Sequence, residues 1–140
     1  MADKKAGVKP FDLTSLDTHE TSESGAVLEV MHPTENVPLG IKITLAGADS
    51  DLYRKAVNKS INKRVQRMKP GQSLPFTAEE QEENGLNLLA TCTLAWEGVL
   101  VDGEVLPCNK ENAKALYQRF PWLREQVDMF IGDRANFLSK

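Results

Sequence analysis

Apolar and polar residues alternate in the first half of the chain in a way that predicts two β-strands. The run 26–31 is short, apolar and rich in β-branched residues, and a turn follows it. In the run 39–45, apolar positions alternate with polar ones, which places Ile41, Ile43 and Leu45 on one face of a strand. Two such runs separated by a turn predict an antiparallel hairpin.

The segment 50–69 predicts an amphipathic helix with an N-cap at Ser50, because its apolar residues recur every three or four positions. This apolar stripe consists of Leu52, Tyr53, Ala56, Val57, Ile61, Val65 and Met68. The opposite face is strongly basic and carries Arg54, Lys55, Lys59, Lys63, Arg64, Arg67 and Lys69. Acids at the start of the helix and bases toward its end also suit the helix dipole.

A second helix is predicted to begin at Thr77, which has Glu80 at the capping-box spacing, and to end at Gly98. Its first turn is acidic and contains Glu79, Glu80, Glu82 and Glu83. Its apolar surface is wide and comprises Leu86, Leu88, Leu89, Ala90, Cys92, Thr93, Leu94 and Trp96. Such a surface predicts a central helix that is largely buried.

Shorter signals complete the expected elements. Asp102-Gly103 lies between two short apolar runs and predicts a tight hairpin. Asn109 is a candidate N-cap for a helix over 110–119, and Pro121 fits the first position of a last helix that we expect to reach about Leu138.

The order of these elements predicts an α+β fold that is mostly helical, with a small antiparallel hairpin or sheet near the N-terminus. Residues 1–25 are mostly polar and are expected to form a flexible N-terminal arm, anchored at most by Phe11 to Leu13 and Leu16. Residues 26–140 are expected to form a single domain.

Composition narrows the classes of function. The chain has 140 residues, of which 41% are hydrophobic, and 17 basic residues against 20 acidic ones give a net charge of −3. A globally basic nucleic-acid-binding domain is therefore not expected. No apolar run approaches the roughly 20 residues that span a membrane, and no secretory signal is seen. Cys92 and Cys108 are thus expected to be free thiols in a reducing compartment.

No pattern of residues points to catalysis, a cofactor or a metal. His19 and His32 have no cysteine or second histidine at metal-ligand spacing, and no nucleophile lies in a Gly-x-Ser-x-Gly context. Phosphate-binding glycine patterns are missing as well. Capping and dipole effects explain the acidic first turn at Glu79 to Glu83.

Binding surfaces remain the main candidates. The basic face of 50–69 is expected to be solvated or to dock an acidic partner, with phosphate binding as a weaker alternative. The acidic turn is a possible mate for it, within one chain or between subunits. The residues considered for partner binding and self-association are Arg54, Lys55, Lys59, Lys63, Arg64, Glu79, Glu80, Glu83, Trp122, Phe130 and Phe137. The three aromatic residues are alternatively part of the core.

An ordered series of short motifs resembles the tail assembly chaperones of long, non-contractile-tailed bacteriophages. The C-terminal part of this series is Trp96-Glu97-Gly98, Asp102-Gly103-Glu104, Asn109 to Asn112, Phe120-Pro121-Trp122-Leu123, Gln126-Val127 and Phe130 to Leu138. The N-terminal part is Met31-His32-Pro33-Thr34, Ile41-Lys42-Ile43, Gly47, Asp49-Ser50 and Tyr53-Arg54. Together these motifs cover roughly residues 26 to 138.

The resemblance implies an assembly factor without enzymatic activity that works in the cytoplasm of the bacterial host. Such a chaperone coats the long helical tape-measure protein, keeps it soluble and recruits the subunits of the tail tube. It would be absent from the finished virion, and this chain would correspond to the short form of the family. The resemblance also suggests self-association into rings or spirals, which requires complementary head-to-tail surfaces.

Two other functions stay open at this stage. The chain is alternatively a structural tail or connector protein of the virion, which purified particles would contain. It is alternatively a nucleic-acid-binding regulator that uses the basic helix 50–69, which would bind duplex DNA with a steep dependence on salt. An enzyme is the last possibility, since it would need a cleft that gathers a histidine, a carboxylate and a nucleophile.

Overall fold

A computed structural model describes residues 10–68, 70–71 and 77–138, and it confirms the α+β class. Its antiparallel sheet has the order β1-β2-β3, and a separate hairpin pairs β4 with β5. The strands are β1 (Ala26–Met31), β2 (Pro38–Leu45), β3 (Thr93–Glu97), β4 (Leu100–Val101) and β5 (Glu104–Val105). The helices are α1 (His19–Ser24), α2 (Asp51–Arg67), α3 (Ala78–Cys92), α4 (Lys110–Arg119) and α5 (Pro121–Gly132), with 3₁₀ turns η1 (Leu13–Leu16) and η2 (Arg134–Phe137).

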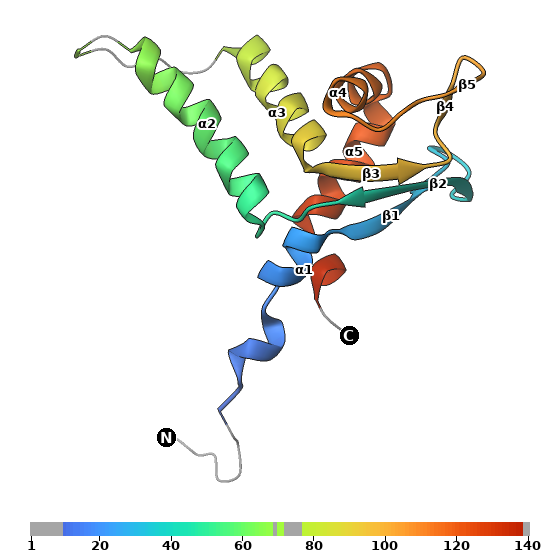
Figure 1. Cartoon of the computed structure of the whole chain (residues 1–140), viewed down its shortest axis with the longest axis horizontal. Helices are drawn as coiled ribbons and strands as arrows, with labels where there is room; N and C mark the ends of the chain where they lie inside the picture. The colour runs from blue at the N-terminus through green and yellow to red at the C-terminus, as the bar shows by residue number, and fades with distance from the viewer. Residues whose placement is uncertain (1–9, 69, 72–76, 139–140) are drawn as a thin grey trace.

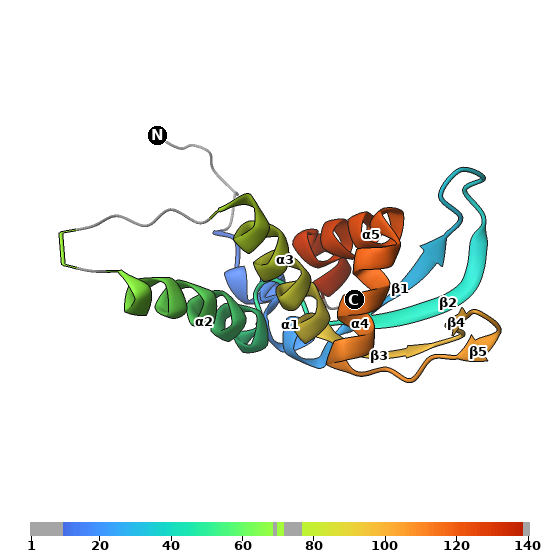
Figure 2. The same cartoon turned by 90° about the horizontal axis from the view of Figure 1, so that it is seen from above.

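Helices α3, α4 and α5 gather on one side of the sheet, and α2 diverges from this group (Figures 1 and 2). The core lies between them. Ile43 and Leu45 of β2 and Val30 of β1 are fully buried, as are Tyr117 of α4 and Val127 of α5. The alternation in the sequence therefore predicted the buried face of β2 correctly.

The two predicted hairpins are present. β1 and β2 pair with Leu28 opposite Ile43, and His32 donates its backbone N–H to Val37 across the connection. In the second hairpin, Asp102 and Gly103 both have positive φ, at 54° and 83°. These values are typical of the type I′ turn that an Asp-Gly pair favours.

The helix predicted from Thr77 to Gly98 is wrong in its last part, because α3 ends at Cys92 and residues 93–97 form β3. The capping box at Thr77 and Glu80 is present as predicted. β3 completes the sheet by pairing with β2, with Trp96 opposite Ile43 on the core side. The sheet is therefore not confined to the N-terminal part of the chain, since its third strand comes from the middle of the sequence.

The last helix is also shorter than predicted. α5 ends at Gly132, and Asp133 then caps η2 by accepting a hydrogen bond from the backbone N–H of Ala135. The side chain of Asn136 donates to the carbonyl of Phe130, which also accepts the backbone N–H of Asp133 at the end of the helix. The chain thereby folds back and buries Phe137 against Phe130, with ring centroids 5.7 Å apart.

Part of the segment 1–25, which was expected to form an arm, has regular structure. Residues 19–24 form α1, and Ser22 is buried against Gly47, where an added methyl group would lie 2.6 Å from the hydroxyl of Ser22. Residues 1–9 of the predicted arm lie outside the described residues, as does the expected connection 72–76.

Asp49 fastens these N- and C-terminal pieces together. It accepts hydrogen bonds from Nε and Nη2 of Arg134 at 2.7 and 2.9 Å and from the hydroxyl of Thr18. These contacts lower the pKa of Asp49 from 3.8 to about 2, and the hydrogen bonds from Arg134 make the largest contribution. Because the pKa falls on folding, the carboxylate stabilises the fold above about pH 4, and that contribution is lost as the pH drops toward 2.

The substitution Asp49→Asn is expected to lower the free energy of unfolding at pH 7 by about 1–2 kcal/mol. The difference from the unsubstituted protein should shrink between pH 4 and pH 2, where Asp49 itself becomes protonated. Urea unfolding followed by circular dichroism at several pH values measures it. Asp102→Asn is the matched control, because Asp102 also pairs with an arginine but its side chain is 73% exposed. A loss that is independent of pH would contradict this role of Asp49.

Candidate protein-docking site

Helix α2 contributes no buried residue to the fold, although it is 17 residues long. The hydroxyl of Ser50 caps it by accepting from the backbone N–H of Tyr53, as the sequence predicted. Among the described helices and strands, α3 is the main neighbour of α2, and the two helices diverge beyond the first turns of α2 (Figure 1). The outer half of its predicted apolar stripe is therefore uncovered, with Ile61 45% and Val65 54% exposed.

An apolar groove of about 220 Å³ runs along one side of the seam between α2 and α3. Val57 and Ile61 of α2 and Gly85 and Leu88 of α3 line it. Gly85 keeps this side of α3 low, since it presents no side chain. A side chain of moderate size, such as leucine, fits a groove of this volume, so the groove is suited to an apolar side chain of a partner helix.

A second groove, of about 430 Å³, lies along the same seam, and we call it the lysine groove. Lys55, Lys59 and Lys63 line it from α2, and Lys110 lines it from the start of α4. Its apolar lining, which we call its apolar floor, is Leu52, Ala56 and Leu88, and its uncharged polar lining is Ser60, Asn84, Asn87 and Thr91. No carboxylate lines the groove, and none of its four lysines is ion-paired within the described part of the chain.

The acidic turn that the sequence offered as a mate for the basic helix is engaged within the chain. Glu80 pairs with Arg67, Glu83 pairs with Lys114, and Glu82 pairs with Arg124. The Arg67 and Lys114 partners lower the pKa values of Glu80 and Glu83, so both acids stay ionised at neutral pH. Of the two possibilities left open by the sequence, these contacts favour pairing within one chain.

The other charged residues considered from the sequence do not line the lysine groove. Arg54 is exposed and pairs with Asp51 one turn earlier, and Arg64 is half-buried. Glu79 is exposed and lines an opening of about 570 Å³ at the far end of the seam, together with Lys63. Lys69 lies outside the described residues.

The aromatic candidates lie away from the seam. Phe137 is only 1% exposed, so it belongs to the fold and is not available as a surface contact. Phe130 and Trp122 are half-buried and pack on the core, and Trp122 meets Phe120 edge to face with centroids 6.1 Å apart. Of the sequence candidates, the structure thus brings the lysines of α2 together in the lysine groove, where it adds Lys110 and the apolar floor, and it gathers Lys63 with Glu79, Glu80 and Glu83 at the far end of the seam.

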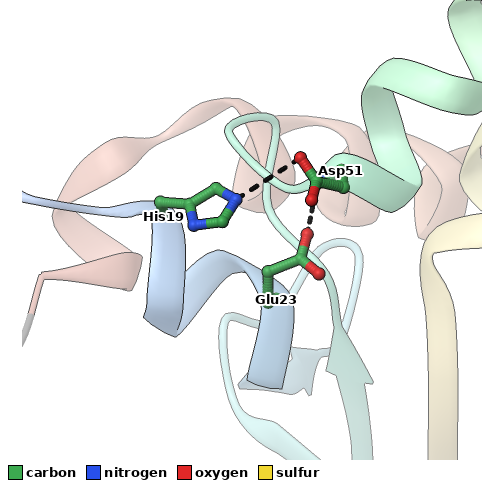
Figure 3. A group of neighbouring side chains, drawn as sticks. All are labelled: His19, Glu23 and Asp51. Carbon is green, nitrogen blue, oxygen red and sulfur yellow. Dashed lines mark hydrogen bonds and ion pairs between the residues drawn. The ribbon is translucent and has the colours of Figure 1, made fainter.

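His19, Glu23 and Asp51 form a polar cluster in which possible metal-ligating atoms lie within 4.8 Å of one another (Figure 3). Each group already has a partner in the chain. Glu23 accepts from the backbone N–H of Asp51, while the carboxylate of Asp51 pairs with Arg54 and lies 3.4 Å from Nε2 of His19. The cluster therefore fastens α1 to the N-terminus of α2, where acidic groups also suit the helix dipole.

Two further side chains that could take part in catalysis, His32 and Cys92, contribute to the fold instead. Nδ1 of His32 accepts from the backbone N–H groups of Thr34 and Glu35 and so stabilises the turn after β1. Burial raises the pKa of Cys92 to about 12, which keeps it a thiol at neutral pH. Neither histidine lines the grooves along the α2–α3 seam.

No described protein family, no curated protein and no solved structure matches the chain. Over the part of the chain that the structure covers, no helix has the length and apolar character to cross a membrane.

Proposed function

We propose that the protein is an assembly chaperone that binds helical segments of a client along the seam between α2 and α3. The observation that carries this proposal is a 17-residue helix without a buried residue, whose apolar side chains Ile61 and Val65 lie exposed beside an apolar groove. Helices in folded proteins are stabilised mainly by burying an apolar face. Docking of a second amphipathic helix would therefore bury the exposed apolar side chains of α2 and stabilise it.

More specifically, we propose a chaperone of tail assembly in a long-tailed bacteriophage, as the motif series between residues 26 and 138 suggests. Its client is the tape-measure protein, a long helical chain whose apolar stripes promote aggregation before the tail tube encloses them. Recruitment of tail-tube subunits in the host cytoplasm, and absence from the finished virion, belong to the same proposal. A long helical reading frame is expected shortly downstream of this gene, and its absence would count against the proposal.

Co-expression with this downstream helical protein tests the function. The chain is expected to raise the soluble fraction of the client severalfold, and the variant Ile61→Glu with Val65→Glu is expected to lose that effect. Because both side chains are exposed, the melting temperature of the variant should change little. The measurement is the client's soluble fraction after centrifugation.

The matched control is Leu100→Glu with Val105→Glu in the β4–β5 hairpin, where both side chains are also exposed. This control should keep the client soluble. Equal loss in both double variants, or no soluble complex with the unsubstituted chain, would contradict the proposed role of the seam. Recovery of the chain in purified virions would favour a structural tail or connector protein.

A further inference from the structure

The segment before α1 exposes three large apolar side chains within six residues. Phe11, Leu13 and Leu16 are 67%, 74% and 51% exposed, and η1 contains no buried residue. Side chains three residues apart in a 3₁₀ helix lie above one another, so Leu13 and Leu16 form one small apolar ridge. We call residues 10–17 the N-terminal segment. Three large apolar side chains clustered on an exposed segment are typical of an interaction site.

The N-terminal segment also carries two acids that have no cationic partner among the residues the structure describes. Asp12 and Asp17 lie at the two ends of η1 and accept hydrogen bonds from the backbone N–H groups of Thr14 and His19. Neither acid is ion-paired with a described residue. The lysine groove has the complementary set: unpaired lysines above a floor of Leu52, Ala56 and Leu88.

The spacings of the two sets agree. At about 2.0 Å per residue in a 3₁₀ turn, Asp12 and Asp17 are separated by about 10 Å. At about 1.5 Å per residue in an α-helix, Lys55 and Lys63 are separated by about 12 Å, with Lys59 between them. Both acids can therefore meet lysines while the leucine ridge faces the apolar floor.

The segment is directed away from the groove of its own chain. Glu23 and Thr18 fasten α1 to the loop before α2, and residues 10–17 then run away from the body on the side opposite the open end of the α2–α3 pair (Figure 1). None of residues 10–17 lines the lysine groove of its own chain. A contact between them joins two copies head to tail, which extends to a ring or a helical filament.

We infer that the N-terminal segment of one copy docks in the lysine groove of a second copy, and that this contact drives self-association of the chain. The inference does not depend on the proposed chaperone function, because it needs no client.

Sedimentation velocity of the purified full chain, over a range of concentrations and at two salt concentrations, tests the inference. The chain is expected to associate, and high salt is expected to weaken the association. Leu13→Ser with Leu16→Ser, and separately Lys55→Glu with Lys59→Glu, should each lower the association constant at least tenfold. The matched controls should leave it unchanged; they are Leu100→Ser with Met129→Ser, which are equally exposed elsewhere, and Lys55→Arg with Lys59→Arg.

A cross-linking experiment shows that the contact joins two chains. In a Cys108→Ser background, chains carrying only Leu16→Cys are mixed with chains carrying only Lys59→Cys and are mildly oxidised. The yield of mixed dimers should be severalfold higher than in a control mixture in which chains with Leu100→Cys replace the chains with Leu16→Cys.

Three results would overturn the inference. The first is a chain that stays monomeric at every concentration. The second is that the variant Leu13→Ser with Leu16→Ser associates as well as the unsubstituted chain, which would assign the groove to another surface or partner. The third is salt-sensitive binding of duplex DNA that Lys55→Glu with Lys59→Glu abolishes while the same variant associates as well as the unsubstituted chain, which would assign the lysines to nucleic acid.

Discussion

Replacing Gly98 by alanine is expected to lower the free energy of unfolding by about 3–4 kcal/mol. Gly98 follows β3 with φ of +79°, a conformation that costs an L-residue about 1–2 kcal/mol. A methyl group there would also overlap the carbonyl oxygen of Gly40 in β2. Since that oxygen belongs to the backbone of a neighbouring strand, relief requires a shift of the sheet, and overpacking of this kind costs a further 1–3 kcal/mol or so.

Gly103→Ala separates these two causes. Gly103 has φ of +83°, close to that of Gly98, but nothing lies within 4 Å of the added methyl group. The loss is therefore expected to be about 1 kcal/mol, from backbone strain alone. Urea unfolding of both variants measures the difference, and equal losses would show that the contact between Gly98 and Gly40 is unimportant.

Replacing Trp96 by alanine is expected to cost about 3 kcal/mol, the lower end of the range for core tryptophans, because the side chain is half-buried. Trp96 packs on the core from β3, and its indole N–H donates to the carbonyl of Leu106 at 2.8 Å. It thereby ties the β4–β5 hairpin to the sheet. For a chain of this size the melting temperature should fall by roughly 10 °C.

Trp96→Phe is the informative second variant. It keeps most of the apolar contact and loses the hydrogen bond to Leu106, so the expected loss is about 1–2 kcal/mol. Neither variant should change client binding at temperatures where it is folded, because Trp96 lines neither groove of the α2–α3 seam. An unchanged melting temperature together with lost client binding would instead place Trp96 at an interface.

Local patterns predicted the elements that depend on local chemistry. The alternation in 39–45, the Asp102-Gly103 turn and the capping box at Thr77 all have the structure that their residues favour. The strand at 93–97 was missed because Leu89, Thr93 and Trp96 also have helical spacing. Only the free edge of β2, which lies far away in sequence, makes the strand the better arrangement.

The features of the candidate docking site could be predicted only in part. The spacing of Lys55, Lys59 and Lys63 by four residues places them on one face of a helix, and the sequence shows this directly. The sequence did not show how much of the apolar stripe of α2 is covered. Nor did it show that Glu82 and Glu83 have partners in Arg124 and Lys114, because these contacts bridge more than 30 residues of chain.

The central claim is that a helical client binds along the seam of α2 and α3. Amide hydrogen exchange of the chain, alone and mixed with the proposed tape-measure client, tests it most directly. We expect slowed exchange in α2 and in the first turns of α3, with the β4–β5 hairpin unchanged. Unchanged exchange in α2, with slowing confined to the sheet or to α5, would contradict the claim.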